Sequence, residues 1–143
     1  MFFRNFEKKI VKFIESKYFG ELDHSKLDFE YGDVYLFDNF VIAEIYEGIH
    51  LDWDKTKAFA EKLIEYYGSG IKLGYISNRV NSYSVDPQSW KRTEKTYNVV
   101  LVASIVSYNV FSSLNAKIEN HFATNKIQNY ASLDEAISWI KSI

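Results

Sequence analysis

The 143-residue chain contains no cysteine, only one proline and six glycines, and no long apolar run. Without cysteine there is no disulfide framework, no thiolate metal site and no cysteine nucleophile. Charges at Arg4, Glu7, Lys8 and Lys9 interrupt the stretch where a secretion signal would be apolar, and no segment approaches the ~20 apolar residues that span a bilayer. The sequence therefore predicts a cytoplasmic protein that is neither secreted nor membrane-spanning.

Charge and aromatic content indicate which kinds of partner the protein could bind. The net charge of -2 is spread along the chain with both signs interspersed, so electrostatics give no reason to expect a nucleic acid. Aromatic residues make up 17% of the chain, which favours a large core whose tyrosines can also serve at interfaces. The length is that of one domain.

The first 25 residues are predicted to form an amphipathic helix and a connector ahead of the main domain, residues 26–143. Apolar side chains recur at helical spacing over residues 2–19, and lysines and Arg4 dominate the opposite face. The pattern allows two interpretations: the helix packs on its own domain, or it lies on a partner or an anionic membrane surface. The candidate membrane face comprises Phe2, Phe3, Phe6, Lys8 and Lys9.

Residues 27–46 carry the sequence signals of β-strands and tight turns. Leu27, Phe29 and Tyr31 alternate with polar residues, and Gly32-Asp33 is predicted as a two-residue turn into a second strand. Asp38-Asn39 is predicted as another tight turn, into a strand over 40–46. These segments predict an antiparallel meander of three strands.

Helices and strands alternate over the rest of the chain, with recognisable start and stop signals. Asp52 is a candidate N-cap, Asp86-Pro87 is a helix start, and Ser132 to Glu135 forms a capping box. The order α-βββ-αβαβαβα predicts an α/β fold with a mixed sheet, in which crossover helices connect parallel strands. The remaining segments are a helix over 53–67, strands over 71–77, 99–106 and 126–130, and a helix marked by Phe111, Leu114, Ile118 and Phe122.

Catalytic chemistry has little support in the residue pattern. The best titratable cluster is His50, Asp52 and Asp54, which would need to converge in one cleft to act on a metal or a proton. Capping by Asp52 and a helix-dipole role for Asp54 explain the same residues more simply. The glycines form no phosphate-binding loop. The sequence predicts no catalytic residues, no metal and no cofactor.

The loop after the strand over 71–77 is the strongest candidate site. It lies at the carboxyl end of a predicted central strand and runs into a helix, where open α/β sheets bind ligands. Arg79 could hold a carboxylate or a phosphate, while Ser82 and Ser84 are candidate phosphorylation sites. The candidate docking residues of the loop are Ser77, Asn78, Arg79, Asn81 and Tyr83.

Three segments resemble the STAS-like proteins, relatives of the anti-sigma factor antagonists: residues 39–45, residues 73–79 and the ending at 132–140. The resemblance covers about residues 27–141. It implies a non-enzymatic domain that docks on proteins and is sometimes switched by serine phosphorylation in the loop after the central strand. The antagonists carry an Asp-Ser-Ser-Gly-type motif there, whereas this chain has Ser77 to Ser82 without the glycine. The fold is also similar to CRAL-TRIO lipid-transfer domains.

Two functions from different classes follow. The first is a regulatory module that docks on another protein, or on a second copy of itself, through the loop over 77–86. The alternative binds a lipid or another apolar molecule, with peripheral membrane contact. The two differ in an observable, because the first predicts a filled core and the second a cavity.

Overall fold

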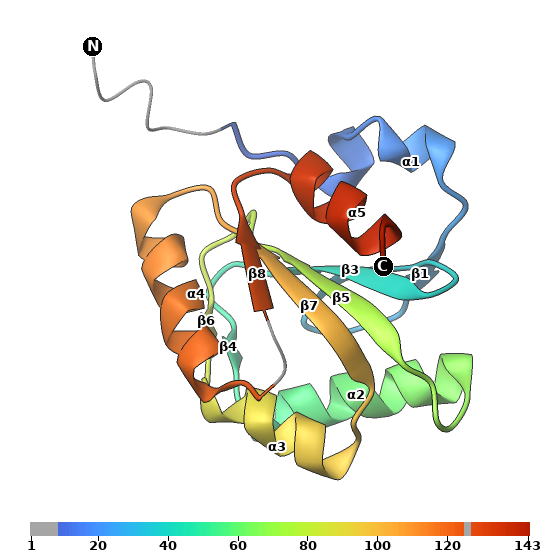
Figure 1. Ribbon diagram of the computed structural model, residues 1–143, viewed down its shortest axis with the longest axis vertical. Helices are drawn as coiled ribbons and strands as arrows, with labels where there is room; N and C mark the ends of the chain where they lie inside the picture. The colour runs from blue at the N-terminus through green and yellow to red at the C-terminus, as the bar shows by residue number, and fades with distance from the viewer. Residues whose placement is uncertain (1–8, 125–126) are drawn as a thin grey trace.

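The computed structural model describes residues 9–124 and 127–143, which form one α/β unit (Figure 1). A six-stranded sheet has the order β1-β2-β3-β5-β7-β8. The strands β1, β2 and β3 pair antiparallel, and β3, β5, β7 and β8 pair parallel. The predicted α/β class and mixed sheet are confirmed. The sequence did not predict the short strands β4 and β6, which pair with each other beside the main sheet.

The elements have the following bounds along the chain. The strands are β1 (Ser25–Leu27), β2 (Gly32–Leu36), β3 (Phe40–Ile45), β4 (His50–Leu51), β5 (Leu73–Asn78), β6 (Ser84–Val85), β7 (Val100–Val106) and β8 (Ile127–Tyr130). The helices are a short 3-10 helix (Phe13–Glu15), α1 (Tyr18–Glu21), α2 (Trp53–Tyr67), α3 (Gln88–Thr96), α4 (Val110–Phe122) and α5 (Leu133–Lys141).

The first predicted turn was misplaced. Gly32 and Asp33 lie inside β2, and the chain reverses over residues 28–31 instead. The alternation that suggested a strand has another cause, because Phe29 leaves the sheet and packs on Phe59 of α2, with ring centroids 4.8 Å apart. Gly32 is required by a close approach rather than by a turn, since a Cβ there would lie 2.8 Å from the carbonyl oxygen of Glu44.

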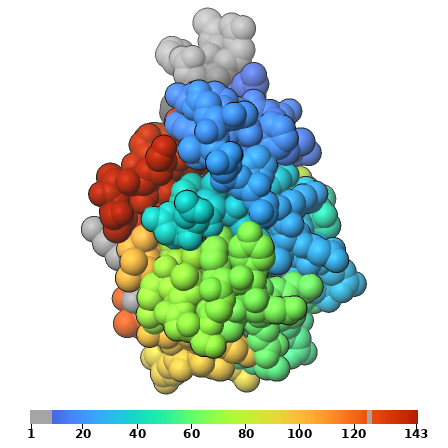
Figure 2. Space-filling view, turned by 90° about the vertical axis from the view of Figure 1, so that its right-hand side faces the viewer, coloured from blue at the N-terminus to red at the C-terminus, as the bar shows by residue number. Residues whose placement is uncertain are grey.

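The predicted continuous helix over residues 2–19 is wrong for the part that the structure describes. Residues 9–12 are not helical, and only the 3-10 helix and the single turn α1 follow. The reason is packing, because Phe13 is fully buried against Tyr35 and Phe37. In Figure 2 the N-terminal part of the chain (blue) covers the upper part of the molecule beside α5 (red).

The sheet separates two layers of helices. The 3-10 helix, α1 and α5 cover one face, and α2, α3 and α4 cover the other (Figure 1). The helix α5 approaches β5 closely, because Gly74 leaves room for Ile140, whose Cγ1 would lie 2.7 Å from a Cβ at that position. The strand β7 was expected to be covered on both faces; its second half is buried, whereas Leu101 is 53% exposed.

The helix α4 packs with its polar side inward. Ala116 and Glu119 are buried on the side that faces the sheet, whereas the large apolar side chains that marked the helix in the sequence face outward. These exposed side chains, together called the α4 apolar face below, are Val110, Phe111, Leu114, Ile118 and Phe122. Among the described residues, no helix has the length and apolar character that crossing a membrane requires.

Candidate functional site

The loop predicted as a docking surface begins inside the protein. Ser77, Asn78 and Arg79 are all buried at the carboxyl end of β5, with Arg79 only 7% exposed. The sequence suggested that Arg79 presents its guanidinium to a partner. This prediction is wrong, because the side chain is buried. The charge on Arg79 is satisfied within the fold by a residue that the sequence reasoning missed.

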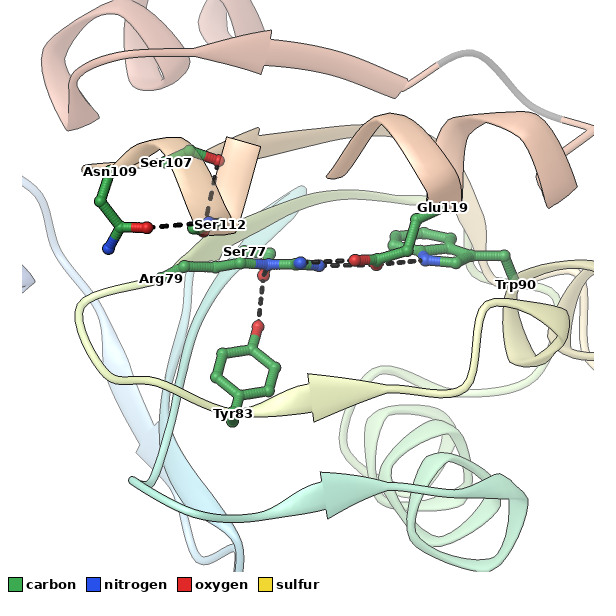
Figure 3. Close-up of polar contacts among 8 residues, drawn as sticks. All are labelled: Ser77, Arg79, Tyr83, Trp90, Ser107, Asn109, Ser112 and Glu119. Atoms are coloured by element: carbon green, nitrogen blue, oxygen red, sulfur yellow. Dashed lines mark hydrogen bonds and ion pairs between the residues drawn. The ribbon is translucent and has the colours of Figure 1, made fainter. Parts of the chain in front are cut away.

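That residue is Glu119, on the inner side of α4. The guanidinium of Arg79 donates from Nη1 and Nη2 to the two carboxylate oxygens of Glu119, at 2.5 and 2.6 Å. The indole Nε1 of Trp90 on α3 donates to Oε1 of the same carboxylate at 2.8 Å. Figure 3 shows the three side chains meeting between β5, α3 and α4. A bidentate pair of this kind fixes both partners and joins three elements.

Ser77 and Tyr83 complete the cluster around the guanidinium. Arg79 Nε donates to Ser77 Oγ at 3.1 Å, and Ser77 Oγ lies 2.8 Å from the hydroxyl of Tyr83 (Figure 3). The guanidinium also lies over the Tyr83 ring, 5.3 Å from its centroid. Burial alone would lower the pKa of Arg79, but Tyr83 and Glu119 more than offset it, so the pKa is raised. The guanidinium therefore remains charged.

Asn78 belongs to a second buried network, at the carboxyl ends of β3, β5 and β7. Its Nδ2 donates to Glu44 Oε2 at 2.7 Å and to the carbonyl oxygen of Val11 at 3.0 Å, and its Oδ1 accepts from the Tyr108 hydroxyl at 2.6 Å. The backbone N–H of Phe13 also donates to Glu44 Oε2. The network thus ties the N-terminal segment to the sheet, and Asn78 has a structural role there.

The outer part of the loop stays accessible. Ser82 and Ser84 are exposed, whereas Asn81 and Tyr83 are half-buried. Asn81 donates from its amide to the carbonyl oxygen of Ile45, and Ser84 Oγ lies 2.7 Å from Nδ1 of His50. The two serines that the sequence named as phosphorylation sites are therefore the part of the loop that solvent reaches.

The remaining predicted site residues have ordinary environments. Asp52 caps α2 by accepting from the backbone N–H of Lys55 at 3.0 Å, as predicted, and Asp54 is exposed in the first turn. In the described ranges 9–124 and 127–143, no group of three or more histidine and carboxylate side chains is placed to hold a metal ion. Of the candidate membrane face, Lys9 is exposed, while Phe2, Phe3, Phe6 and Lys8 lie outside the described residues.

A cavity of about 90 Å³ adjoins the Arg79 cluster. It lies between the sheet and the helices α2, α3 and α4, and Arg79, Glu119, Ser77 and Tyr83 form its polar wall. Its other lining residues are mostly apolar and include Leu51, Phe59, Ala60, Leu63, Val99 and Ala103.

Two hydroxyl groups of α3 line this cavity without a hydrogen-bond partner in the part of the protein that the structure describes. They are Ser89 Oγ and Thr93 Oγ1, one helical turn apart, and Ser89 is only 4% exposed. A buried hydroxyl without a partner costs roughly 1–3 kcal/mol, so native proteins rarely keep one for packing alone. Both groups can donate to and accept from a molecule in the cavity.

Few features of the sequence indicate these residues. The segment that forms α3 is almost entirely polar, so its inner side could not be recognised by hydrophobic periodicity. Glu119 could not be identified because the apolar side of a surface helix is ordinarily the side that faces the sheet. The only available signal was the polar set Ser112, Glu119 and Asn120 at helical spacing opposite that apolar side.

No family model, no curated protein and no solved structure matches the chain. The resemblance to STAS-like proteins therefore stays a prediction.

Proposed function

We propose that this domain is a non-enzymatic binding module that holds a small, uncharged, mainly apolar molecule in the cavity between the sheet and α3. The observation that carries the proposal is the pair of buried hydroxyls, Ser89 and Thr93, which line a mainly apolar cavity and have no hydrogen-bond partner among residues 9–124 and 127–143. It is one branch of the second function inferred from the sequence, the binding of a lipid or another apolar molecule, because that function required a cavity in place of a filled core.

The lining defines the chemistry of the ligand. Arg79 and Glu119 neutralise each other in a bidentate pair, and Glu94, the third charged residue of the lining, accepts from the Thr124 N–H. The lining therefore favours an uncharged ligand over a charged one. The apolar walls favour a compact hydrocarbon body, and the two hydroxyls favour one hydroxyl or carbonyl group at its end. A cavity of about 150 Å³ is known to admit benzene, so this smaller cavity of about 90 Å³ excludes a lipid and takes a single ring only if α3 shifts slightly outward.

The helix α3 is the element that a ligand would displace to enter. Ser89 is the one buried residue of α3, and Trp90 anchors the helix through its hydrogen bond to Glu119. An element that buries so little apolar surface opens at a lower cost than a core helix does. Entry beside α3 therefore requires no unfolding of the sheet.

Phenol should bind this cavity more tightly than benzene, because its hydroxyl can pair with Ser89 or Thr93. We expect phenol to bind with a Kd below about 1 mM, by titration calorimetry, and to raise the unfolding temperature. In the double variant Ser89→Ala, Thr93→Val, the affinity for phenol should fall about tenfold, to that for benzene.

The double variant also provides its own folding control. Removing two unpartnered hydroxyls should leave the unliganded protein at least as stable as the native one, because nothing loses a hydrogen bond. Equal affinities for phenol in the native and variant proteins, or no binding of either compound, would rule out this site.

Protein docking, the first function inferred from the sequence, stays a second proposal that is supported by the exposed α4 apolar face. Arg79 is not part of that surface, for the reason given above. Ser82 and Ser84 remain proposed phosphorylation sites because both are exposed. A cytoplasmic location, a STAS-like ancestry and peripheral membrane contact likewise remain proposals.

A further inference from the structure

The orientation of α4 is the reverse of what a surface helix normally shows. Phe111, Leu114 and Ile118 are 68%, 53% and 51% exposed, while Glu119 on the opposite side is 2% exposed. A surface helix of a monomer ordinarily buries its apolar stripe and exposes its charges. A continuous exposed apolar stripe of this kind marks an interaction surface.

The stripe is self-complementary about the middle of the helix. Leu114 lies two residues before Ala116 and Ile118 two residues after it, while Phe111 lies five before and Phe122 six after. In an antiparallel pair around a two-fold axis near Ala116, Leu114 of one copy faces Ile118 of the other, and Phe111 faces Phe122. Such reciprocal contact is what a symmetric dimer interface requires.

The charges on α4 also suit a second copy of the chain. Lys117 is the only lysine or arginine on the helix and lies on the flank of the stripe, so it reaches solvent at the rim of a pair. A helix that rests on an anionic membrane instead carries many lysines and arginines beside its apolar face. The single cation gives little such attraction.

We propose that α4 is the interface of a symmetric homodimer, in which the α4 apolar faces of two copies pack antiparallel. The helix is about 20 Å long, and two helices pack 8–10 Å apart. One helix pair is smaller than a standard interface, so the dimer should be reversible, with a Kd of about 10 µM. The proposal is independent of the cavity.

Sedimentation velocity over a concentration range of the full chain tests the dimer. The native protein should change from monomer to dimer between about 1 and 100 µM. The double variant Leu114→Glu, Ile118→Glu should remain a monomer at every concentration, because it places four carboxylates in the paired interface. Its unfolding midpoint should stay close to the native value, since both side chains are exposed in the monomer.

The matched control is Ser138→Glu, which adds a carboxylate to the exposed side of α5 on the other face of the sheet. It should dimerise as the native protein does. A native protein that is monomeric up to 100 µM overturns the proposal, as does a Leu114→Glu, Ile118→Glu variant that still dimerises. Co-sedimentation of a monomeric native protein with anionic vesicles, lost in that variant, would assign the face to a membrane instead.

Discussion

Replacing Glu119 with alanine is expected to lower the free energy of unfolding by about 3–5 kcal/mol. Glu119 is the partner of the buried Arg79 and also accepts from Trp90 Nε1. Without the carboxylate, the guanidinium stays charged inside the protein with no counter-ion, and the indole N–H loses its acceptor. An arginine side chain keeps its proton at ordinary pH even inside a protein, so loss of the proton cannot relieve the cost.

Urea unfolding of three proteins measures this effect. The double variant Arg79→Met, Glu119→Leu removes both charges and should recover most of the lost stability, because a buried ion pair is often no better than apolar side chains of similar volume. If Glu119→Ala unfolds within 1 kcal/mol of the native protein, then Arg79 is not held by this pair. In that case its role as a free anion-binding residue, which the sequence suggested, would return.

Replacing Glu44 with alanine should lower the free energy of unfolding by about 2–4 kcal/mol. The backbone N–H of Phe13 loses its acceptor, and the side-chain amide of Asn78 loses one of its two acceptors. Glu44→Gln is the matched control, since its amide oxygen can still accept from both groups. The glutamine variant should be close to the native protein at low pH. Urea unfolding at several pH values gives both comparisons.

The pH dependence distinguishes a buried carboxyl from an exposed one at this position. Burial raises the pKa of Glu44 above the usual value of about 4.3, although Phe13 and Asn78 oppose the shift. The folded state then binds the proton more tightly than the unfolded state does. Glu44 therefore contributes stability at low pH, and this contribution is lost as the pH rises from the ordinary carboxyl pKa through the raised one. As the pH rises through this window, the native protein should lose stability relative to the Glu44→Gln variant. If the stabilities of the two proteins change with pH in the same way, the Glu44 carboxyl is not buried as described.

The order of the elements could be predicted because their signals are local. Asp52 and Ser132 both cap helices at the expected positions, by accepting from Lys55 N–H and Glu135 N–H. β-Branched and aromatic residues likewise identified β3, and helical stops at Gly68 and Gly70 ended α2 as expected. Each of these signals depends on a few neighbouring residues and needs no knowledge of tertiary packing.

The site could not be predicted because it depends on which side of each helix meets the sheet. Periodicity shows that Phe111, Leu114 and Ile118 share one side of α4, but not that this side faces outward. Once α4 is placed, Glu119 meets Arg79, and the loop after β5 changes from a docking surface into a buried cluster. The pairing joins residues 40 positions apart, a separation over which local patterns carry no information.

A crystal structure of the protein equilibrated with phenol would show whether the cavity beside α3 is a binding site. We expect density for one ring between α3 and the sheet, with its hydroxyl within hydrogen-bond distance of Ser89 Oγ or Thr93 Oγ1. Density for water alone around these hydroxyls, with phenol absent from the cavity, would mean that the cavity is no binding site for such a ligand.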